Sequence, residues 1–169
     1  MKKNKLLLTS ILSVSLIASN AIASSIPNKN PTQNISAIQS GLSISDQWIR
    51  MPADTSVNTA AYFNIQNNTD QNIKIVEASI EGDVCKHTEI HGYKSDDHGV
   101  MRMFKLESIT IPAKTSIEFK PGSNHIMLMG LNKKFVRNSY YNITLKFLPA
   151  NAENNIATVS KMEIKFPVK

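Results

Sequence analysis

Short stretches of alternating apolar and polar residues recur along the chain from Leu42 onward. A period of two is typical of a strand with one buried face, and the connecting segments are rich in turn-forming Gly, Pro, Asn and Asp. No stretch sustains a helical period. The pattern predicts strands at Leu42–Arg50, Ala60–Gln66, Ile73–Ser79, Val84–His91, Val100–Leu106, Ser116–Phe119, His125–Met129, Tyr141–Leu148 and Ile156–Phe166. Short strands with short connections predict an all-β, antiparallel β-sandwich.

The N-terminus follows a different pattern. Three lysines within the first five residues precede an apolar run from Leu6 to Ala18, and small residues follow at Ala21 and Ala23. The run is about a dozen residues long, shorter than the roughly 20 that a membrane-spanning helix needs. Residues 1–23 are therefore predicted to be a signal peptide that is cleaved near Ala23. The mature protein is predicted to be exported, with no membrane insertion.

Composition divides the remaining chain into two parts. Residues 24–40 are rich in Ser, Asn, Pro and Gln and nearly free of large apolar side chains, which predicts a flexible leader. Residues 41–169 are predicted to form a single domain. Loss of three lysines with the signal peptide lowers the formal charge from +6 to +3, and the other lysines are scattered. Nucleic-acid binding requires a clustered basic face, so no nucleic-acid partner is expected.

Soft metal donors are concentrated in one part of the sequence. All four histidines, the one cysteine and four of the seven methionines lie between residues 85 and 129. Imidazole and thioether together suit copper(I), whereas zinc prefers His, Cys or carboxylate and calcium prefers oxygen. A methionine in a strand is more often core filler, and a histidine beside a turn is more often solvated. The concentration of both residue types in one segment favours a copper(I) site.

Strand geometry indicates which donors can converge. Side chains at i and i+2 project from the same face of a strand, so His125 and Met127 point together while Ile126 and Leu128 face the core. Either Met101 or Met103 is placed to supply a third donor, and His91, at the end of its predicted strand, a fourth.

These residues also carry a family resemblance. Met103 and His125 are separated by 21 residues, and His125-Ile126-Met127 completes a His-x-Met motif. The segment resembles the PCu(A)C-type periplasmic copper chaperones, whose pattern is a His, ten residues, a Met, twenty-one residues and His-x-Met. The flanking segments that agree are Trp48–Arg50 with Pro52, Ala61–Asn67, Glu89–His91, Gly99–Met103, Ile111–Ala113 and Pro121–Leu131.

The sequence departs from this pattern at one point. His91 and Met103 have 11 residues between them, one more than in the family. We attribute the extra residue to a surface loop at the polar stretch Tyr93–His98, because an insertion there leaves the flanking strands in register. The intact 21-residue gap favours Met103 over Met101, and the Glu-Ile-His context favours His91 over His87.

The resemblance implies a cupredoxin-like β-sandwich in the periplasm that binds copper(I) through His91, Met103, His125 and Met127. It also implies a copper-accepting partner, a subunit or assembly factor of cytochrome c oxidase that receives copper for the dinuclear centre. Neutral ligands permit transfer by stepwise exchange with a partner's cysteine thiolates. No catalytic base or nucleophile is predicted, so the protein is not expected to be an enzyme.

Two other classes of function compete with the chaperone hypothesis. An electron-transfer protein of the blue-copper type needs a thiolate beside two histidines, and strand alternation places Cys85 on the same face as His87 and His91. Cys85 precedes the His-x-Met pair, however, whereas such proteins take their ligands from a C-terminal loop. A metal-free secreted interaction module would instead use the methionines as a contact surface, Met101, Met103, Met127 and Met129.

Overall fold

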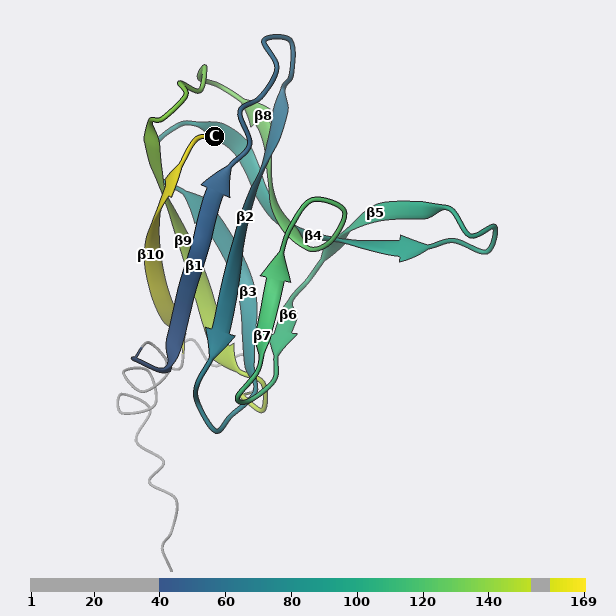
Figure 1. The fold of residues 1–169 in the computed structure, drawn as a ribbon, viewed down its shortest axis with the longest axis vertical. Helices are drawn as coiled ribbons and strands as arrows, with labels where there is room; N and C mark the ends of the chain where they lie inside the picture. The colour runs from purple at the N-terminus through teal and green to yellow at the C-terminus, as the bar shows by residue number, and fades with distance from the viewer. Residues whose placement is uncertain (1–39, 153–158) are drawn as a thin grey trace, which may run out of the picture.

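Two antiparallel sheets pack face to face in the computed structural model, which describes residues 40–152 and 159–169 (Figure 1). The strands are β1 (Leu42–Ile49), β2 (Asn58–Asn67), β3 (Ile73–Ile80), β4 (Cys85–Ser95), β5 (Met101–Leu106), β6 (Ile109–Ile111), β7 (Ser116–Phe119), β8 (His125–Leu131), β9 (Tyr140–Pro149) and β10 (Ser160–Pro167). The predicted class, a cupredoxin-like antiparallel β-sandwich, is confirmed.

The strand order places the donor-rich segment in one sheet. The six-stranded sheet has the order β1-β2-β8-β4-β5, with β7 also paired to β2, and the four-stranded sheet has the order β10-β9-β3-β6. Both β7 and β8 pair with β2, β7 with residues 63–66 and β8 with residues 58–61. They therefore form one interrupted strand along β2, and the connection 120–124 leaves the sheet immediately before His125.

Alternation along the strands separates the core from the outer face of this sheet. Ile126 and Leu128 of β8 are fully buried in the core, as the sequence predicts. The stacked rings of Phe63 and Phe119 join them, with ring centres 4.2 Å apart. His125 and Met127 occupy the intervening positions and project from the opposite face.

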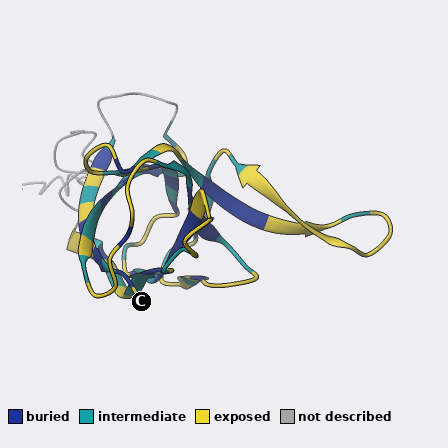
Figure 2. Cartoon of the chain, turned by 90° about the horizontal axis from the view of Figure 1, so that it is seen from above, coloured by how far each residue is buried: buried dark blue, intermediate teal, exposed yellow. Residues whose placement is uncertain are grey.

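The β4–β5 hairpin extends beyond the sandwich as a two-stranded arm (Figure 1). Its base is buried at Ile90, His91 and Gly92, whereas residues 93–95 and 101–105 are exposed (Figure 2). The pairing continues without a register shift from Ile90 with Leu106 to Ser95 with Met101. Tyr93–Ser95 therefore belong to β4, and the prediction of a loop over Tyr93–His98 was wrong for these three residues. Cross-strand hydrogen bonding extends β4 as far as the turn at residues 96–100.

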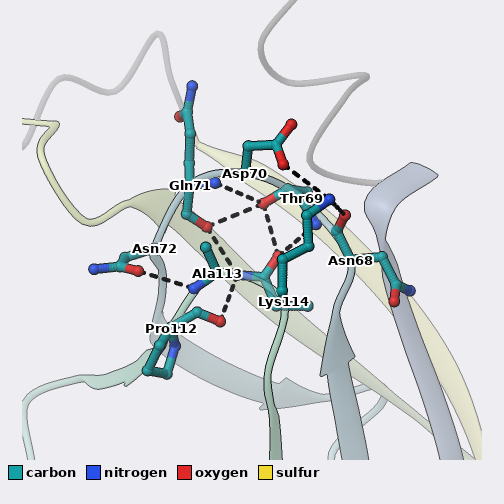
Figure 3. Close-up of polar contacts among 9 residues, drawn as sticks. Asn68, Thr69, Asp70, Gln71, Asn72, Pro112, Ala113 and Lys114 are labelled. Atoms are coloured by element: carbon teal, nitrogen blue, oxygen red, sulfur yellow. Dashed lines mark hydrogen bonds and ion pairs between the residues drawn. The ribbon is translucent and has the colours of Figure 1, made fainter.

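A buried asparagine connects the two sheets at the opposite end of the sandwich. The side-chain amide of Asn67 donates to the carbonyls of Gln71, Ile111 and Pro112, at 2.8, 3.1 and 3.1 Å. Figure 3 shows the neighbouring contacts that join the β2–β3 turn to the loop after β6, among them the Ala113 amide donating to the Asn72 side chain at 2.9 Å. This network holds the point where the chain crosses from β6 to β7.

Most predicted strands match the structure, with boundaries shifted by a few residues. The exceptions are β6, which the sequence pattern missed, and the last strand, whose predicted start at Ile156 lies outside the described residues. The predicted signal peptide and all but the last residue of the predicted leader also lie outside them. Within the two described ranges, no helix combines the length and apolar character that crossing a membrane requires.

Candidate metal centre

Three neighbouring strands bring the four predicted ligands to one face of the six-stranded sheet. His125 and Met127 lie on β8, and His91 lies directly opposite His125 on β4. Met103 lies on β5 opposite Tyr93, two residues beyond His91 along β4. Residues directly opposite in a ladder share a face, so the alternation continues across all three strands.

His125 is buried against aromatic rings although it projects from the outer face. Its side chain is enclosed by Tyr62, Tyr93 and His91, whose ring centres lie 6.2, 5.8 and 5.7 Å from the His125 ring. The residue as a whole is only 4% exposed. Burial lowers the pKa of His125, the hydrogen bond to the Ser123 carbonyl opposes this effect, and the electrostatic influence of His91 and Arg50 lowers the pKa further. The imidazole therefore remains neutral at pH values where an ordinary histidine is partly charged.

The hydrogen bonds of His125 determine which nitrogen is free. Nδ1 lies 2.9 Å from the Ser123 carbonyl oxygen, which can only accept, so Nδ1 carries the proton. Nε2 of the neutral ring is then a bare lone pair, and it lies 3.1 Å from Sδ of Met103. A thioether sulfur also offers only lone pairs. Two atoms that both present lone pairs and share no hydrogen repel each other, and a cation bound between them would stabilise this arrangement.

The distance between these two atoms fits a single ion. Metal bonds to imidazole nitrogen and to sulfur measure about 2.0 and 2.3 Å in zinc sites. Their sum exceeds the 3.1 Å between Nε2 and Sδ, so one ion can contact both atoms. A cavity of about 280 Å³ opens at this point, and its lining includes Met103, His125, Met127, Tyr62 and Arg50.

His91 lies directly opposite His125 on the buried side of the group, and it is not among the residues that line this cavity. It is 8% exposed, and its Nε2 lies 2.8 Å from a carboxylate oxygen of Glu89. Its Nδ1 is buried and has no hydrogen-bond partner among the described residues. A buried polar atom without a partner is uncommon in folded proteins and needs an explanation. A bound metal ion would supply the missing partner.

The other candidate donors lie farther from the cavity. Met101 is 57% exposed and pairs with Ser95, one step farther out along the arm than Met103. His87 is exposed and lies opposite Met129, and His98 is exposed at the tip of the hairpin. None of these four side chains lines the cavity beside His125.

Cys85 lies at the start of β4, directly opposite Leu131. Its half-buried side chain packs against the core, and its sulfur lies 3.6 Å from the Thr88 hydroxyl. The opposing strand carries Gly130 in a left-handed conformation (φ 64°), and Leu131 beyond it also packs against the core. The cavity that His125 lines contains no thiolate from Cys85, which disfavours the blue-copper alternative.

Sequence reasoning did not assign Glu89, Tyr62, Tyr93 and Ser123 to the site. The period of two contained a signal for two of them, because Glu89 and Tyr93 stand two residues before and after His91. Ser123 acts through its backbone carbonyl, which no side-chain pattern reveals. Tyr62 reaches the site through the pairing of β2 with β8.

The chain belongs to the family described as "Putative lipoprotein LpqE-like", whose model matches residues 42–159. This family is related to the PCuAC domains, so the resemblance found in the sequence is confirmed. A "Putative lipoprotein Lxx21020" of Leifsonia xyli subsp. xyli is 24% identical over 86% of this chain and 84% of its own length. The "Uncharacterized protein RP573" of Rickettsia prowazekii is 36% identical over 42% of this chain, but the match spans only 38% of that relative.

Solved structures share the fold over most of the described chain. The copper(I) form of DR1885 from Deinococcus radiodurans is 25% identical, with a TM-score of 0.54 over 81% of this chain and 84% of its own. The apo PCuAC domain of PmoF1 has a TM-score of 0.60 at 23% identity, covering 76% and 93%. The copper-bound PCuAC domain of PmoF2 has a TM-score of 0.58 at 17% identity, covering 76% and 92%.

Proposed function

We propose that this protein is an exported, non-enzymatic copper(I) chaperone that binds one ion through His91, Met103, His125 and Met127. The observation that carries the proposal is the bare Nε2 of His125 facing Sδ of Met103 at 3.1 Å, in a cavity that Met127 also lines. His91 adds a second imidazole with an unpartnered nitrogen. The ion is cargo in this mechanism, acquired and released intact.

The donor set supports copper(I) over other metals. Within the described residues, no group of three or more His, Cys, Asp or Glu side chains is placed to hold a metal ion. A site here therefore depends on thioether sulfur, which suits the soft copper(I) ion and suits zinc or calcium poorly. The copper-bound PmoF2 domain and copper(I) DR1885, which share the fold, support the same metal.

Release by ligand exchange is consistent with the exposure of the ligands. His91 and His125 are buried at the base of the site, whereas Met103 is 44% exposed on the projecting arm. A partner thiolate can displace a neutral, exposed thioether first and then draw the ion away from the two imidazoles. We infer that the recipient is a copper-accepting protein, a subunit or assembly factor of cytochrome c oxidase, as the family resemblance implies.

The proposed location is the periplasm. Residues 1–23 have the pattern of a cleavable signal peptide, with cleavage near Ala23. The descriptions of the family and of the Leifsonia relative as lipoproteins support export.

The test is an anaerobic copper(I) titration of the chain from residue 24 against a competing chromophoric chelator. Wild type is expected to bind one equivalent, and Met127→Leu to lose binding or weaken it by more than about tenfold, which is about 1.4 kcal/mol. Met129→Leu is the matched control, because Met129 shares strand and face with Met127 but does not line the cavity. Absence of competitive binding by wild type would refute the proposal. Equal weakening by both substitutions would refute the assignment of Met127.

A further inference from the structure

The buried imidazole of His91 has a different environment at each nitrogen. Nε2 lies 2.8 Å from Oε2 of Glu89, and Nδ1 has no partner among the described residues. Glu89 precedes His91 by two positions on β4, so both side chains project from the same face. The carboxylate therefore reaches the ring from within the same strand.

The chemistry of this contact assigns the proton. A carboxylate only accepts hydrogen bonds, so Nε2 of His91 carries the hydrogen. Nδ1 is then either a bare lone pair, in the neutral ring, or a buried N–H without an acceptor, in the charged ring. A buried donor without an acceptor is strongly disfavoured. In the neutral ring, the hydrogen on Nε2 leaves the lone pair on Nδ1.

A lysine on the adjacent strand holds the carboxylate in place. Lys105 lies directly opposite His91 on β5, and its Nζ is 3.5 Å from Oε1 of Glu89. One carboxylate oxygen thus contacts His91 and the other faces Lys105. Glu89 is also directly opposite Met127 on β8, which places it beside two of the proposed ligands.

The two histidines have different ring nitrogens free to bind a metal ion. The Ser123 carbonyl occupies Nδ1 of His125 and leaves Nε2 free, whereas Glu89 occupies Nε2 of His91 and leaves Nδ1 free. The ring centres are 5.7 Å apart in an edge-to-face arrangement. A single ion with bonds of about 2 Å to each ring can span such a separation.

We propose that Glu89 is a positioning residue that fixes His91 as the Nε2–H tautomer, so that copper(I) is bound through Nδ1 of His91 and Nε2 of His125. The inference rests on the proposed function. A carboxylate that accepts a hydrogen bond from a ligating histidine fixes its tautomer and raises the basicity of the other nitrogen. Glu89 also places a negative charge next to a cation whose four ligands are neutral.

The tautomer can be measured without metal. Long-range ¹H–¹⁵N correlation spectra of the apo protein, recorded near pH 8, above the ordinary pKa range of histidine, report which ring nitrogen is protonated. Wild type is expected to show His91 as Nε2–H and His125 as Nδ1–H. In Glu89→Leu, His91 is expected to give the averaged shifts of an unconstrained ring, for which the exposed His98 is the internal reference. Glu89→Gln retains an acceptor and is expected to keep the tautomer.

The copper(I) measurements complete the test. Addition of copper(I) is expected to move the Nδ1 resonance of His91 and the Nε2 resonance of His125. Affinity is expected to fall roughly 10–100-fold in Glu89→Leu and less in Glu89→Gln. Glu118→Leu is the matched control, because Glu118 is an exposed carboxylate paired with Lys120 on the same sheet. Its substitution is expected to change neither the tautomers nor the affinity.

The outcomes separate this inference from the proposed function. If wild type binds no copper(I), both are overturned. If wild type binds one ion but His91 is the Nδ1–H tautomer, or Glu89→Leu leaves tautomer and affinity unchanged, only the role of Glu89 is overturned. If Glu89→Leu does not fold, Glu89→Gln and the wild-type spectra still decide which nitrogen binds.

Discussion

His125 combines deep burial with a fixed proton. Burial is the main cause that lowers its pKa, and the Ser123 carbonyl holds the proton on Nδ1. A buried imidazole that resists protonation keeps Nε2 available to metal at mildly acidic pH. Protons still compete with metal when the pH falls further, so copper affinity is expected to decline with acidification.

The lowered pKa predicts how stability of the apo protein depends on pH. The unfolded chain takes up a proton on His125 near pH 6.5, its ordinary value, whereas the folded state does so only at lower pH. The unfolded state binds more protons between these two values, so the free energy of unfolding falls as the pH decreases through that window. Urea unfolding at a series of pH values from about 7.5 downward checks this.

A variant and a control isolate the contribution of His125 to this dependence. His125→Gln is expected to flatten the pH dependence below about 6.5, whereas the exposed His98→Gln retains the wild-type slope. An unchanged slope in His125→Gln contradicts the prediction.

The two methionines of β5 provide a second comparison at the residue scale. Met103 contacts His125 and lines the cavity, whereas Met101 is farther out on the arm. Loss of a residue that only hydrogen-bonds to a metal ligand typically lowers metal affinity roughly 10–100-fold. Met103→Leu removes a proposed ligand itself, so it is expected to weaken copper(I) binding by at least this factor. Met101→Leu is expected to leave binding within about twofold of wild type, a difference of less than about 0.5 kcal/mol. Chelator competition on both variants checks this, and the reverse ranking would assign the ligand to Met101.

The β4–β5 arm is the element on which the site depends most. Its outer part is exposed on both faces, and an isolated two-stranded hairpin is only marginally stable in water. Met103 lies on this arm, while His125 and Met127 lie on a strand in the middle of the sheet. A bound ion would therefore link the exposed β4–β5 arm to β8, which lies in the middle of the sheet.

Hydrogen exchange is expected to report this connection. In the apo protein, the amides of β5 are expected to exchange faster than those of β8, because few buried contacts support the arm. Addition of copper(I) is expected to slow exchange in β5 in wild type but not in Met103→Leu. Protection of β5 by copper(I) in that variant contradicts the idea that Met103 makes the link.

At the scale of the whole molecule, the two sheets are held together by the apolar core and by contacts where the chain crosses between them. Phe63 packs edge-on against Phe166 of the other sheet, with ring centres 5.9 Å apart. The buried Asn67 satisfies three backbone carbonyls near the β6–β7 crossing. The hydrogen bonds that buried polar groups make at this crossing therefore contribute to the stability of the sandwich.

Removal of the Asn67 side chain is expected to cause a measurable loss of stability. Asn67→Ala removes three buried or part-buried hydrogen bonds, although the Gln71 and Pro112 carbonyls keep donors from Thr69 and Thr115. It is expected to lower the free energy of unfolding by about 1–3 kcal/mol. Asn68→Ala, at the next and exposed position, is expected to change it by less than about 0.5 kcal/mol. Urea unfolding checks both values. A similar loss in the two variants indicates that the effect comes from the turn backbone and not from the buried amide.

Much of the fold was predictable because alternation reflects burial directly. The run from His125 to Met129 shows it best, since its buried residues and its outward donors follow the period of two. β6 was missed because three residues are too few to establish a period, and its place depends on pairing with β3. Cys85, at the start of β4, packs against the core, a contact that the alternation alone did not specify.

The sequence by itself determined the class of fold, the types of donor atom and the spacing that brings His125 and Met127 to one face. These properties are local, because they depend on residue chemistry and on the period of a strand. Only the tertiary structure decided that Met103 contacts His125, and which nitrogen of each imidazole is free. Those features depend on strand pairing and on hydrogen-bond partners, and the pairing joins β8 to a strand more than 30 residues earlier in the chain. A pattern along the chain does not specify contacts between strands that meet only when the sheet forms.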